Sequence, residues 1–226
     1  MKTKIWHISD THTYHDLLEV PEVDMVIHSG DAANVRDKYQ NQKEFLEFLD
    51  WFGTLLVGYR IFSPGNHDTC LDTKLIREED FTSRGIIYLN EDEVVINGLK
   101  IYGQPYTPTY GSGWSFNCAR DKMYKHWDKV PDDIDILVTH GPPKGILDLS
   151  YSREGDLEFC GDLTLKRKMF MNRPKLVCFG HVHNCDNITN AGYTKLATHN
   201  TIYSNGSVVT DGRFGKLSSN GNIFEI

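Results

Sequence analysis

The sequence has no long apolar run and comparatively little positive charge. No stretch approaches the roughly 20 apolar residues of a membrane-spanning helix, and the amino terminus, MKTKIWHISD, lacks an apolar segment of signal-peptide length. Lys and Arg number 24 against 31 Asp and Glu, so the formal charge is −7. We therefore expect a cytoplasmic protein that enters no membrane and does not bind the phosphate backbone of long nucleic acids.

Cysteine pairs of the kind that bind structural zinc are also lacking. The five cysteines are an odd number, and none forms a Cys-x-x-Cys motif. This usage predicts free thiols in a reducing compartment. Repeats, low-complexity tracts and long linkers are absent too, so we predict a single domain over residues 1–226.

What recurs instead is a short apolar run closed by Gly, Pro or Asp, which is typical of buried strands. Five such runs occur, in KIWHISDTH, MVIHSGD, RIFSPGNHD, DILVTHGPP and KLVCFGHVH. Between the second and third, Phe residues recur at helical spacing, and Asn41 with Glu44 resembles a capping box. A hairpin is predicted at Asn97-Gly98 and a helix over 163–172. This mixture predicts an α/β protein with mixed sheets.

Metal-ligand side chains gather at the ends of the five apolar runs. In open α/β sheets, sites form at the carboxyl ends of strands, and residues i and i+2 of an extended segment point to the same side. Carboxylates, a carboxamide and imidazoles suit Mn, Fe, Zn or Ni better than Ca. Each residue, taken alone, is also a plausible turn or capping residue. The candidates are Asp10, His12, Asp31, Asn66, His140, His181 and His183.

Seven such side chains are more than one ion with an open coordination position needs. Two ions about 3.5–4 Å apart that share one carboxylate would use all of them. The pair His181-x-His183 would then supply one imidazole to each ion.

The motifs resemble the five-block signature of the calcineurin-like metallophosphoesterases. The blocks run in the family's order as Asp10-x-His12, Gly30-Asp31, Gly65-Asn66-His67-Asp68, His140 and Gly180-His181-Val182-His183. A narrower resemblance, carried by YGQPYTPTYGSGWSFNCARD, THGPPKGILDL and NRPKLVCFGHVH, is to the metallophosphoesterase-domain-containing, 239FB-like branch. The resemblance implies an α/β fold of four layers, in which two packed mixed β-sheets are flanked by helices.

The resemblance also implies a role for each matching residue. Asp31 would bridge the two metals, and His67 would face the substrate, stabilising the phosphoryl oxygens or protonating the leaving group. Asp68 would hold and polarise His67, with a plain turn residue as the alternative. One metal would take Asp10, His12, Asp31 and His183, and the other Asp31, Asn66, His140 and His181.

Three further residues are candidates for contact with substrate. Asn34 follows the Gly-Asp block and is equally a loop residue. The aromatic segment 105–127 could stack a nucleobase or pack over the sheet edge, and Trp114 and Asn117 are its substrate-side candidates. Of the remaining histidines, His7 and His28 are expected to be buried within strands. We expect surface or loop positions for His15, His126 and His199.

The activity implied by the resemblance is hydrolysis of small phosphodiesters, cyclic nucleotides among them, by a metal-activated hydroxide that attacks phosphorus. It implies two divalent ions, with Mn²⁺ preferred and Fe, Zn or Ni as alternatives. A phosphomonoesterase or protein phosphatase would use the same centre, whereas the charge of −7 disfavours a nuclease. A non-catalytic scaffold is less consistent with retention of His67 and every ligand. The oligomeric state is left open, with a homodimer as one alternative.

Overall fold

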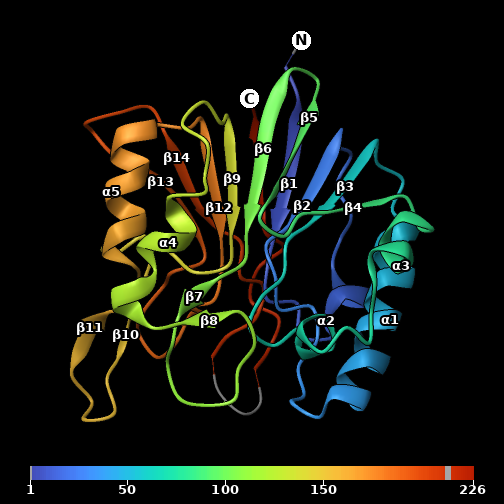
Figure 1. Cartoon of the computed structure of the whole chain (residues 1–226), viewed down its shortest axis with the longest axis horizontal. Helices are drawn as coiled ribbons and strands as arrows, with labels where there is room; N and C mark the ends of the chain where they lie inside the picture. The colour runs from blue at the N-terminus through green and yellow to red at the C-terminus, as the bar shows by residue number, and fades with distance from the viewer. Residues whose placement is uncertain (1, 212–214) are drawn as a thin grey trace.

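Two mixed β-sheets packed face to face form the centre of the protein (Figure 1). The structure is a computed structural model that describes residues 2–211 and 215–226. Helices cover the outer face of each sheet, so the molecule has four layers. The predicted fold class, two packed mixed sheets flanked by helices, is confirmed.

The first sheet has five strands, of which four run parallel. Its strands in spatial order are β15 (Asn222–Glu225), β1 (Lys4–Ile8), β2 (Met25–His28), β3 (Tyr59–Phe62) and β4 (Ile86–Tyr88), with β15 antiparallel to β1.

The second sheet has six strands, with an antiparallel strand at each edge. In spatial order they are β13 (Gly192–Lys195), β14 (Ile202–Asn205), β12 (Leu176–Phe179), β9 (Ile136–Thr139), β6 (Leu99–Gln104) and β5 (Asp92–Ile96).

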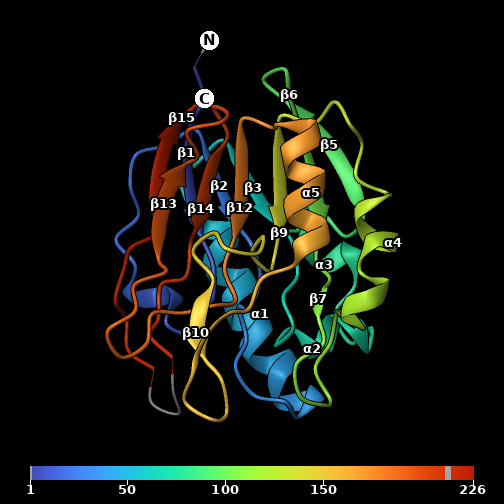
Figure 2. The same ribbon diagram turned by 90° about the vertical axis from the view of Figure 1, so that its left-hand side faces the viewer.

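The helices divide between the two outer faces, as Figures 1 and 2 show, with α5 lying across β9 and β12. The first sheet is covered by α1 (Lys38–Thr54), α2 (Thr69–Asp72) and α3 (Glu78–Thr82), and the second by α4 (Tyr124–Trp127) and α5 (Leu163–Asn172). Two single 3₁₀ turns, η1 (His15–Leu17) and η2 (Arg120–Lys122), lie in loops.

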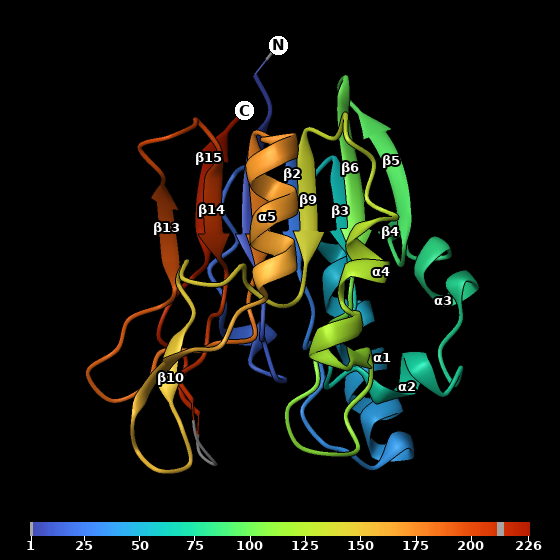
Figure 3. The same ribbon diagram turned by 60° about the vertical axis from the view of Figure 1, so that its left-hand side comes forward.

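Two short ribbons extend from the end of the sheets opposite the chain termini (Figures 1 and 3). They are formed by β7 (Thr107–Pro108) with β8 (Asn117–Cys118), and by β10 (Leu149–Tyr151) with β11 (Leu157–Phe159). The parallel strands end at the same side of the molecule, so the two ribbons lie beside the loops that follow these strands.

The apolar core has three parts because successive strand residues face opposite sides. Ile27 of β2 belongs to the layer between the sheets, whereas its neighbour Val26 packs with Phe48 of α1. On the other side, Leu137 of β9 packs with Leu165 of α5. The central strands, such as β2, β9 and β12, are therefore almost continuously apolar, because they are buried on both faces. No helix within the described ranges is long and apolar enough to cross a membrane.

The predicted hairpin and the second predicted helix are confirmed. The chain turns between β5 and β6 at Asn97 and Gly98, which have φ values of 53° and 78°. Positive φ at both central residues is what a tight type I′ hairpin requires. Helix α5 begins after Asp162, whose carboxylate accepts a hydrogen bond from the Leu165 amide.

The predicted capping box is wrong. Helix α1 begins at Lys38, and Asp37 caps it by accepting from the amides of Tyr39 and Gln40. Asn41 and Glu44 lie inside the helix and bind segments distant in sequence, which no local pattern can indicate.

The histidines divide partly as expected. His7 and His28 are fully buried, as predicted. His126 and His199 are partly exposed. His15 lies in the loop between β1 and β2 but not at the surface: the residue is only 3% exposed, and its ring packs against Phe48 and Trp51. The loop position agrees with the prediction, and the burial arises because η1 folds back onto α1.

We predict that Phe48→Ala lowers the free energy of unfolding by about 3–5 kcal/mol, because it leaves a cavity among fully buried rings. Urea denaturation measures this change. The control Leu56→Ala removes a side chain that is 98% exposed and should stay within about 0.5 kcal/mol of the wild type. A Phe48→Ala change as small as that of the control would contradict the assigned core.

Candidate functional site

The five sequence blocks meet at one end of the two sheets. Asp10 and Asp31 follow β1 and β2 of the first sheet, and Asn66 follows β3. His140 directly follows β9 of the second sheet, and His181 lies just beyond β12. Because all five strands are parallel within their sheets, their carboxyl ends bring these side chains together.

The backbone of this region is strained. Asp10, His12, Asp31 and His181 have φ values of 52°, 41°, 60° and 69°. Non-glycine residues adopt positive φ only where the surrounding structure imposes it, and such residues gather at functional sites.

The glycines of the blocks allow close packing of the carboxylates. A Cβ at Gly65 would lie 2.2 Å from Asp31 Oδ1, and one at Gly180 would lie 2.0 Å from Asp10 Oδ2. Larger residues would push both carboxylates out of place.

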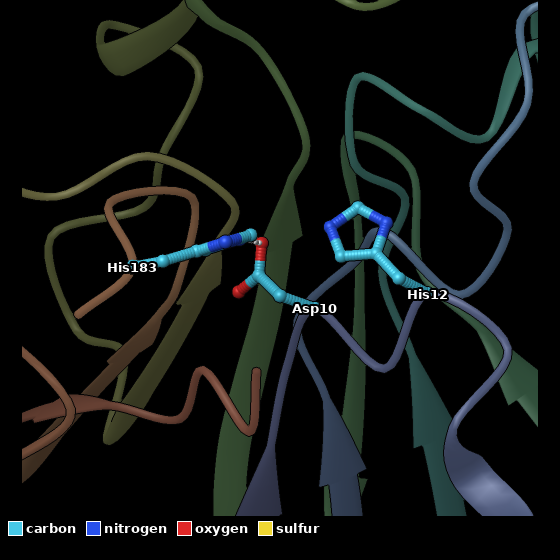
Figure 4. Close-up of side chains that lie close together, drawn as sticks. All are labelled: Asp10, His12 and His183. Carbon is cyan, nitrogen blue, oxygen red and sulfur yellow. Dashed lines mark hydrogen bonds and ion pairs between the residues drawn. The ribbon is translucent and has the colours of Figure 1, made fainter. Parts of the chain in front are cut away.

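The first candidate metal group comprises Asp10, His12 and His183, whose ligand atoms all lie within 4.8 Å of one another. His183 Nε2 is 3.0 Å from Asp10 Oδ1, and the ring of His12 lies on the other side of the carboxylate (Figure 4). His12 Nδ1 donates to the Ala33 carbonyl at 3.0 Å, which leaves Nε2 as the inward-facing ligand atom. Ser207 Oγ donates to Asp10 Oδ2 at 2.7 Å and so orients the carboxylate.

The second candidate group comprises Asp31, His140 and His181. His140 Nδ1 donates to the Ser29 carbonyl at 2.9 Å, which directs Nε2 toward the other members of the group. That nitrogen lies 3.2 Å from Asp31 Oδ2 and 3.0 Å from Asn66 Oδ1. Three electron-rich atoms thus converge in a buried place, which is favourable when a cation lies between them.

Asp31 stands between the two groups. Its Oδ2 atom lies 3.9 Å from His12 Nε2 and 3.2 Å from His140 Nε2. A carboxylate with this placement can bridge two ions, as the sequence predicts. The donor set therefore fits two divalent metals.

The pKa values show that the site stabilises positive charge. Burial alone lowers the pKa of His140, but the negative charge of Asp31 and a hydrogen bond to it raise the pKa to about 9. At Asp31, burial alone would raise the carboxyl pKa, but the positive charge of His140 outweighs it and holds the pKa well below its usual range. Burial dominates at His12 and His181, whose pKa values fall to about 4 and about 3. Those two imidazoles are neutral near pH 7, as metal ligands must be.

His67 faces the same space. Its Nδ1 donates to the Asn34 carbonyl at 2.8 Å, so Nε2 is directed away from that loop. Its ring lies 4.7 Å from the ring of His12 and 4.0 Å from that of Trp114. The third cluster of potential ligands contains His12, Asp31 and His67, so His67 is next to both candidate metal groups.

The expected partner of His67 is corrected. Asp68 is fully buried, and its carboxylate accepts hydrogen bonds from the backbone amides of Asp31, Ala32, Ala33 and Gly65 at 2.8–3.2 Å. Burial and the negative charge of Asp31 raise the pKa of Asp68 to about 7. Asp68 therefore ties the loop after β2 to the loop after β3, and the Asn34 carbonyl orients His67 instead.

Two residues of α1, Asn41 and Glu44, for which the sequence pattern predicts a cap, hold this arrangement instead. Asn41 Nδ2 donates to the carbonyls of Val35 and His67, both at 2.7 Å. Glu44 accepts from the amides of Asn34 and Val35 at 2.8 and 3.1 Å. The loop whose carbonyl orients His67 is thus fixed by the helix beside it.

A cleft of about 500 Å³ opens beside the metal groups. His12, Asp31, His67, His181 and His183 line this cleft, and its lining also includes Tyr110, Lys144, Tyr151 and Phe159. Asn34 is not among the described residues that line the cleft, but its backbone carbonyl accepts from His67 Nδ1.

The two candidates from the aromatic segment lie elsewhere. Trp114 covers His67 and has the Arg36 guanidinium 3.8 Å from its ring centroid. Asn117 donates to Thr107 Oγ1 and the Ser115 carbonyl within its own ribbon. Neither is among the described residues that line the cleft. Tyr110 of the same segment does line it, although its aromatic character was the only sequence signal.

Comparison with known proteins agrees with this geometry. A family model described as calcineurin-like phosphoesterase matches residues 3–185. The chain therefore belongs to the calcineurin-like metallophosphoesterase family, and the fold and site define a metal-dependent hydrolase of phosphoric esters. Within the family it belongs to the metallophosphoesterase-domain-containing branch.

Relatives in animals and a bacterial structure are similar to the chain. "Metallophosphoesterase domain-containing protein 1" of Homo sapiens is 32% identical over 234 residues, which cover 92% of this chain and 67% of the relative. "UPF0046 protein C25E10.12" of Caenorhabditis elegans is 32% identical over 211 residues, which cover 85% of this chain and 73% of the relative. The crystal structure of phosphopantetheinyl hydrolase (PptH) from Mycobacterium tuberculosis shares the fold, with a TM-score of 0.57 and 14% sequence identity. The match covers 92% of this chain and 89% of that protein.

We predict that the wild-type protein binds two equivalents of Mn²⁺ and that Asp31→Asn binds at least one fewer, because both candidate sites lose a shared charge. Elemental analysis after metal loading and desalting measures the stoichiometry. The control Asp132→Asn alters an exposed carboxylate paired with Lys168 and should retain two. Equal metal content in Asp31→Asn and the wild type would exclude the bridging role.

Chelation should destabilise the protein, because it removes the positive charge of the metal from two buried carboxylates and several imidazoles. At metal concentrations near 100 times Kd we expect EDTA to lower the thermal midpoint by about 5–10 °C. Scanning fluorimetry measures the shift, and adding Mn²⁺ back should reverse it. A midpoint indifferent to EDTA would count against a metal centre here.

Proposed function

We propose that this protein is a dinuclear-metal phosphodiesterase that hydrolyses small phosphodiesters, such as cyclic nucleotides or related compounds. The observation that carries the proposal is the position of Asp31 between two Asp–His groups, with His67 beside both in the lining of one cleft. This arrangement supports hydrolysis with a proton donor next to the metal-activated nucleophile.

The residues of the chain have separate tasks in this mechanism. Bound divalent ions, for which we propose Mn²⁺, would supply an activated water and neutralise phosphoryl charge. The Asn34 carbonyl holds the Nδ1 proton of His67, so Nε2 is the atom that meets the phosphoryl oxygens or the leaving group. Asp68 keeps the loops of Asp31 and His67 in register by accepting from their amides. Positioning of this kind supplies catalysis without a covalent phospho-enzyme.

The shape and charge of the protein favour a small substrate. A cleft of about 500 Å³ has room for a nucleotide-sized ester, with aromatic side chains of Tyr110, Tyr151 and Phe159 on its wall. The formal charge of −7 disfavours long nucleic acids as partners. Free cysteines fit a cytoplasmic setting, which we also propose, without a membrane partner.

Comparison of an aryl phosphodiester with the matching aryl monoester tests this function. Metal-stripped protein reconstituted with Mn²⁺ should show a strongly higher kcat/KM for the diester. A preference for the monoester would support a phosphomonoesterase that uses the same centre. Absence of turnover with either ester, at full metal content, would favour the non-catalytic scaffold.

Replacing His67 tests its role. We predict that His67→Asn lowers kcat about 10²–10⁴-fold, because proton donation to the phosphoryl or leaving group is lost, while Mn²⁺ content stays unchanged. Steady-state kinetics and elemental analysis measure the two quantities. His199→Asn changes a histidine outside the cleft and should leave kcat unaffected. An unaltered kcat in His67→Asn would remove this residue from the mechanism.

A further inference from the structure

Tyr110 borders both the second metal group and the cleft, and the mechanism above gives its hydroxyl no task. It lies in the loop between β7 and β8, and its ring centroid is 4.8 Å from that of His181. It lines the cleft together with Asp31 and His67. Its phenol is therefore close to where a phosphoryl group bound at the metals would lie.

The direction of its hydrogen bond is determined by Asn66. The carboxamide of Asn66 is fully buried and turns Oδ1 toward His140 Nε2, at 3.0 Å. Its Nδ2 atom therefore points the other way and donates to the Tyr110 hydroxyl at 3.1 Å. An amide nitrogen can only donate, so the phenol oxygen accepts this bond and keeps its own proton available for a second one.

That proton has no acceptor in the described part of the protein. The bond from Asn66 is the one hydrogen bond of the Tyr110 hydroxyl within residues 2–211 and 215–226. A donor on the wall of a site, already oriented and without a protein acceptor, is suited to an anionic oxygen of a ligand.

We propose that Tyr110 is a substrate-contacting residue whose phenol O–H donates a hydrogen bond to a non-bridging phosphoryl oxygen, with Asn66 fixing its orientation. This contact rests on the proposed function, because it requires a phosphate ester in the cleft. The phenol of Tyr110 would then have two partners. The metal ligand Asn66 aligns it, and a substrate oxygen accepts its hydrogen bond.

A competing role for the hydroxyl is to align the carboxamide of Asn66 and nothing more. In that case loss of the hydroxyl would act through weaker metal binding, and excess metal would repair it. The two roles therefore differ in their response to metal loading.

The test is Tyr110→Phe, which keeps the ring against His181 and removes the hydroxyl. The matched control is Tyr124→Phe on α4, whose side chain is exposed and whose hydroxyl has no hydrogen bond among the described residues. Both variants and the wild type are loaded with Mn²⁺, desalted and analysed for metal. Calorimetric titration with methylphosphonate, a stable phosphoryl mimic, then measures binding, and steady-state assays with an aryl diester measure kcat/KM.

With the metal content of the wild type, Tyr110→Phe should bind methylphosphonate about 10- to 100-fold more weakly and lose kcat/KM to a similar extent, as expected for a hydrogen bond to a charged group. Tyr124→Phe should match the wild type. If Tyr110→Phe at full metal content matches the wild type, or recovers its affinity only when Mn²⁺ is added, the proposal is overturned.

The wild-type protein distinguishes failure of this contact from failure of the proposed function. If it does not bind methylphosphonate, the contact is wrong whatever the activity. If it binds the mimic and Tyr110→Phe does not, yet neither hydrolyses any ester, the phosphodiesterase function fails and the contact at Tyr110 stands.

Discussion

Side-chain atoms of Asn66 and His140 meet the Asp31 carboxylate at one buried point, where the loops after three strands converge. His140 Nε2 lies 3.0 Å from Asn66 Oδ1 and 3.2 Å from Asp31 Oδ2, and all three residues are buried. Positive charge among these atoms, from a proton on His140 or from a divalent metal, offsets their repulsion at low dielectric, and the scaffold holds them in place. The same arrangement of charge raises the pKa of His140 and lowers that of Asp31.

The scaffold holds them through backbone groups rather than through other charges. Carbonyls of Ser29 and Ala33 accept the Nδ1 protons of His140 and His12, which directs both Nε2 atoms inward. Asp68 gathers amides from two loops, and the positive φ values of Asp10 and Asp31 turn their carboxylates toward the same place. The energy of this strained arrangement is offset by the three apolar layers that fix the strands beneath it.

Helix α1 connects the core to the chemistry. Its apolar face, with Phe45 and Phe48, packs on the first sheet, while Asn41 and Glu44 reach the loop that orients His67. Sequence spacing makes Asn41 and Glu44 look like a cap, because a capping box and a pair of loop anchors have the same local pattern. The choice between them depends on where residues 34–35 and His67 lie, and this is decided by strand order.

Five central strands, the hairpin at Asn97-Gly98, helix α5 and the seven candidate ligands could be predicted from the sequence, because short apolar runs, turn chemistry and ligand blocks are local properties. It also indicated the two metal groups, since i and i+2 residues follow parallel strands whose ends must meet. Only the tertiary structure decided that Asn34 rather than Asp68 orients His67, that His15 is buried, and that Tyr110 rather than Trp114 or Asn117 faces the cleft. Each of these depends on contacts between segments far apart in the chain, for which the sequence carries no local pattern.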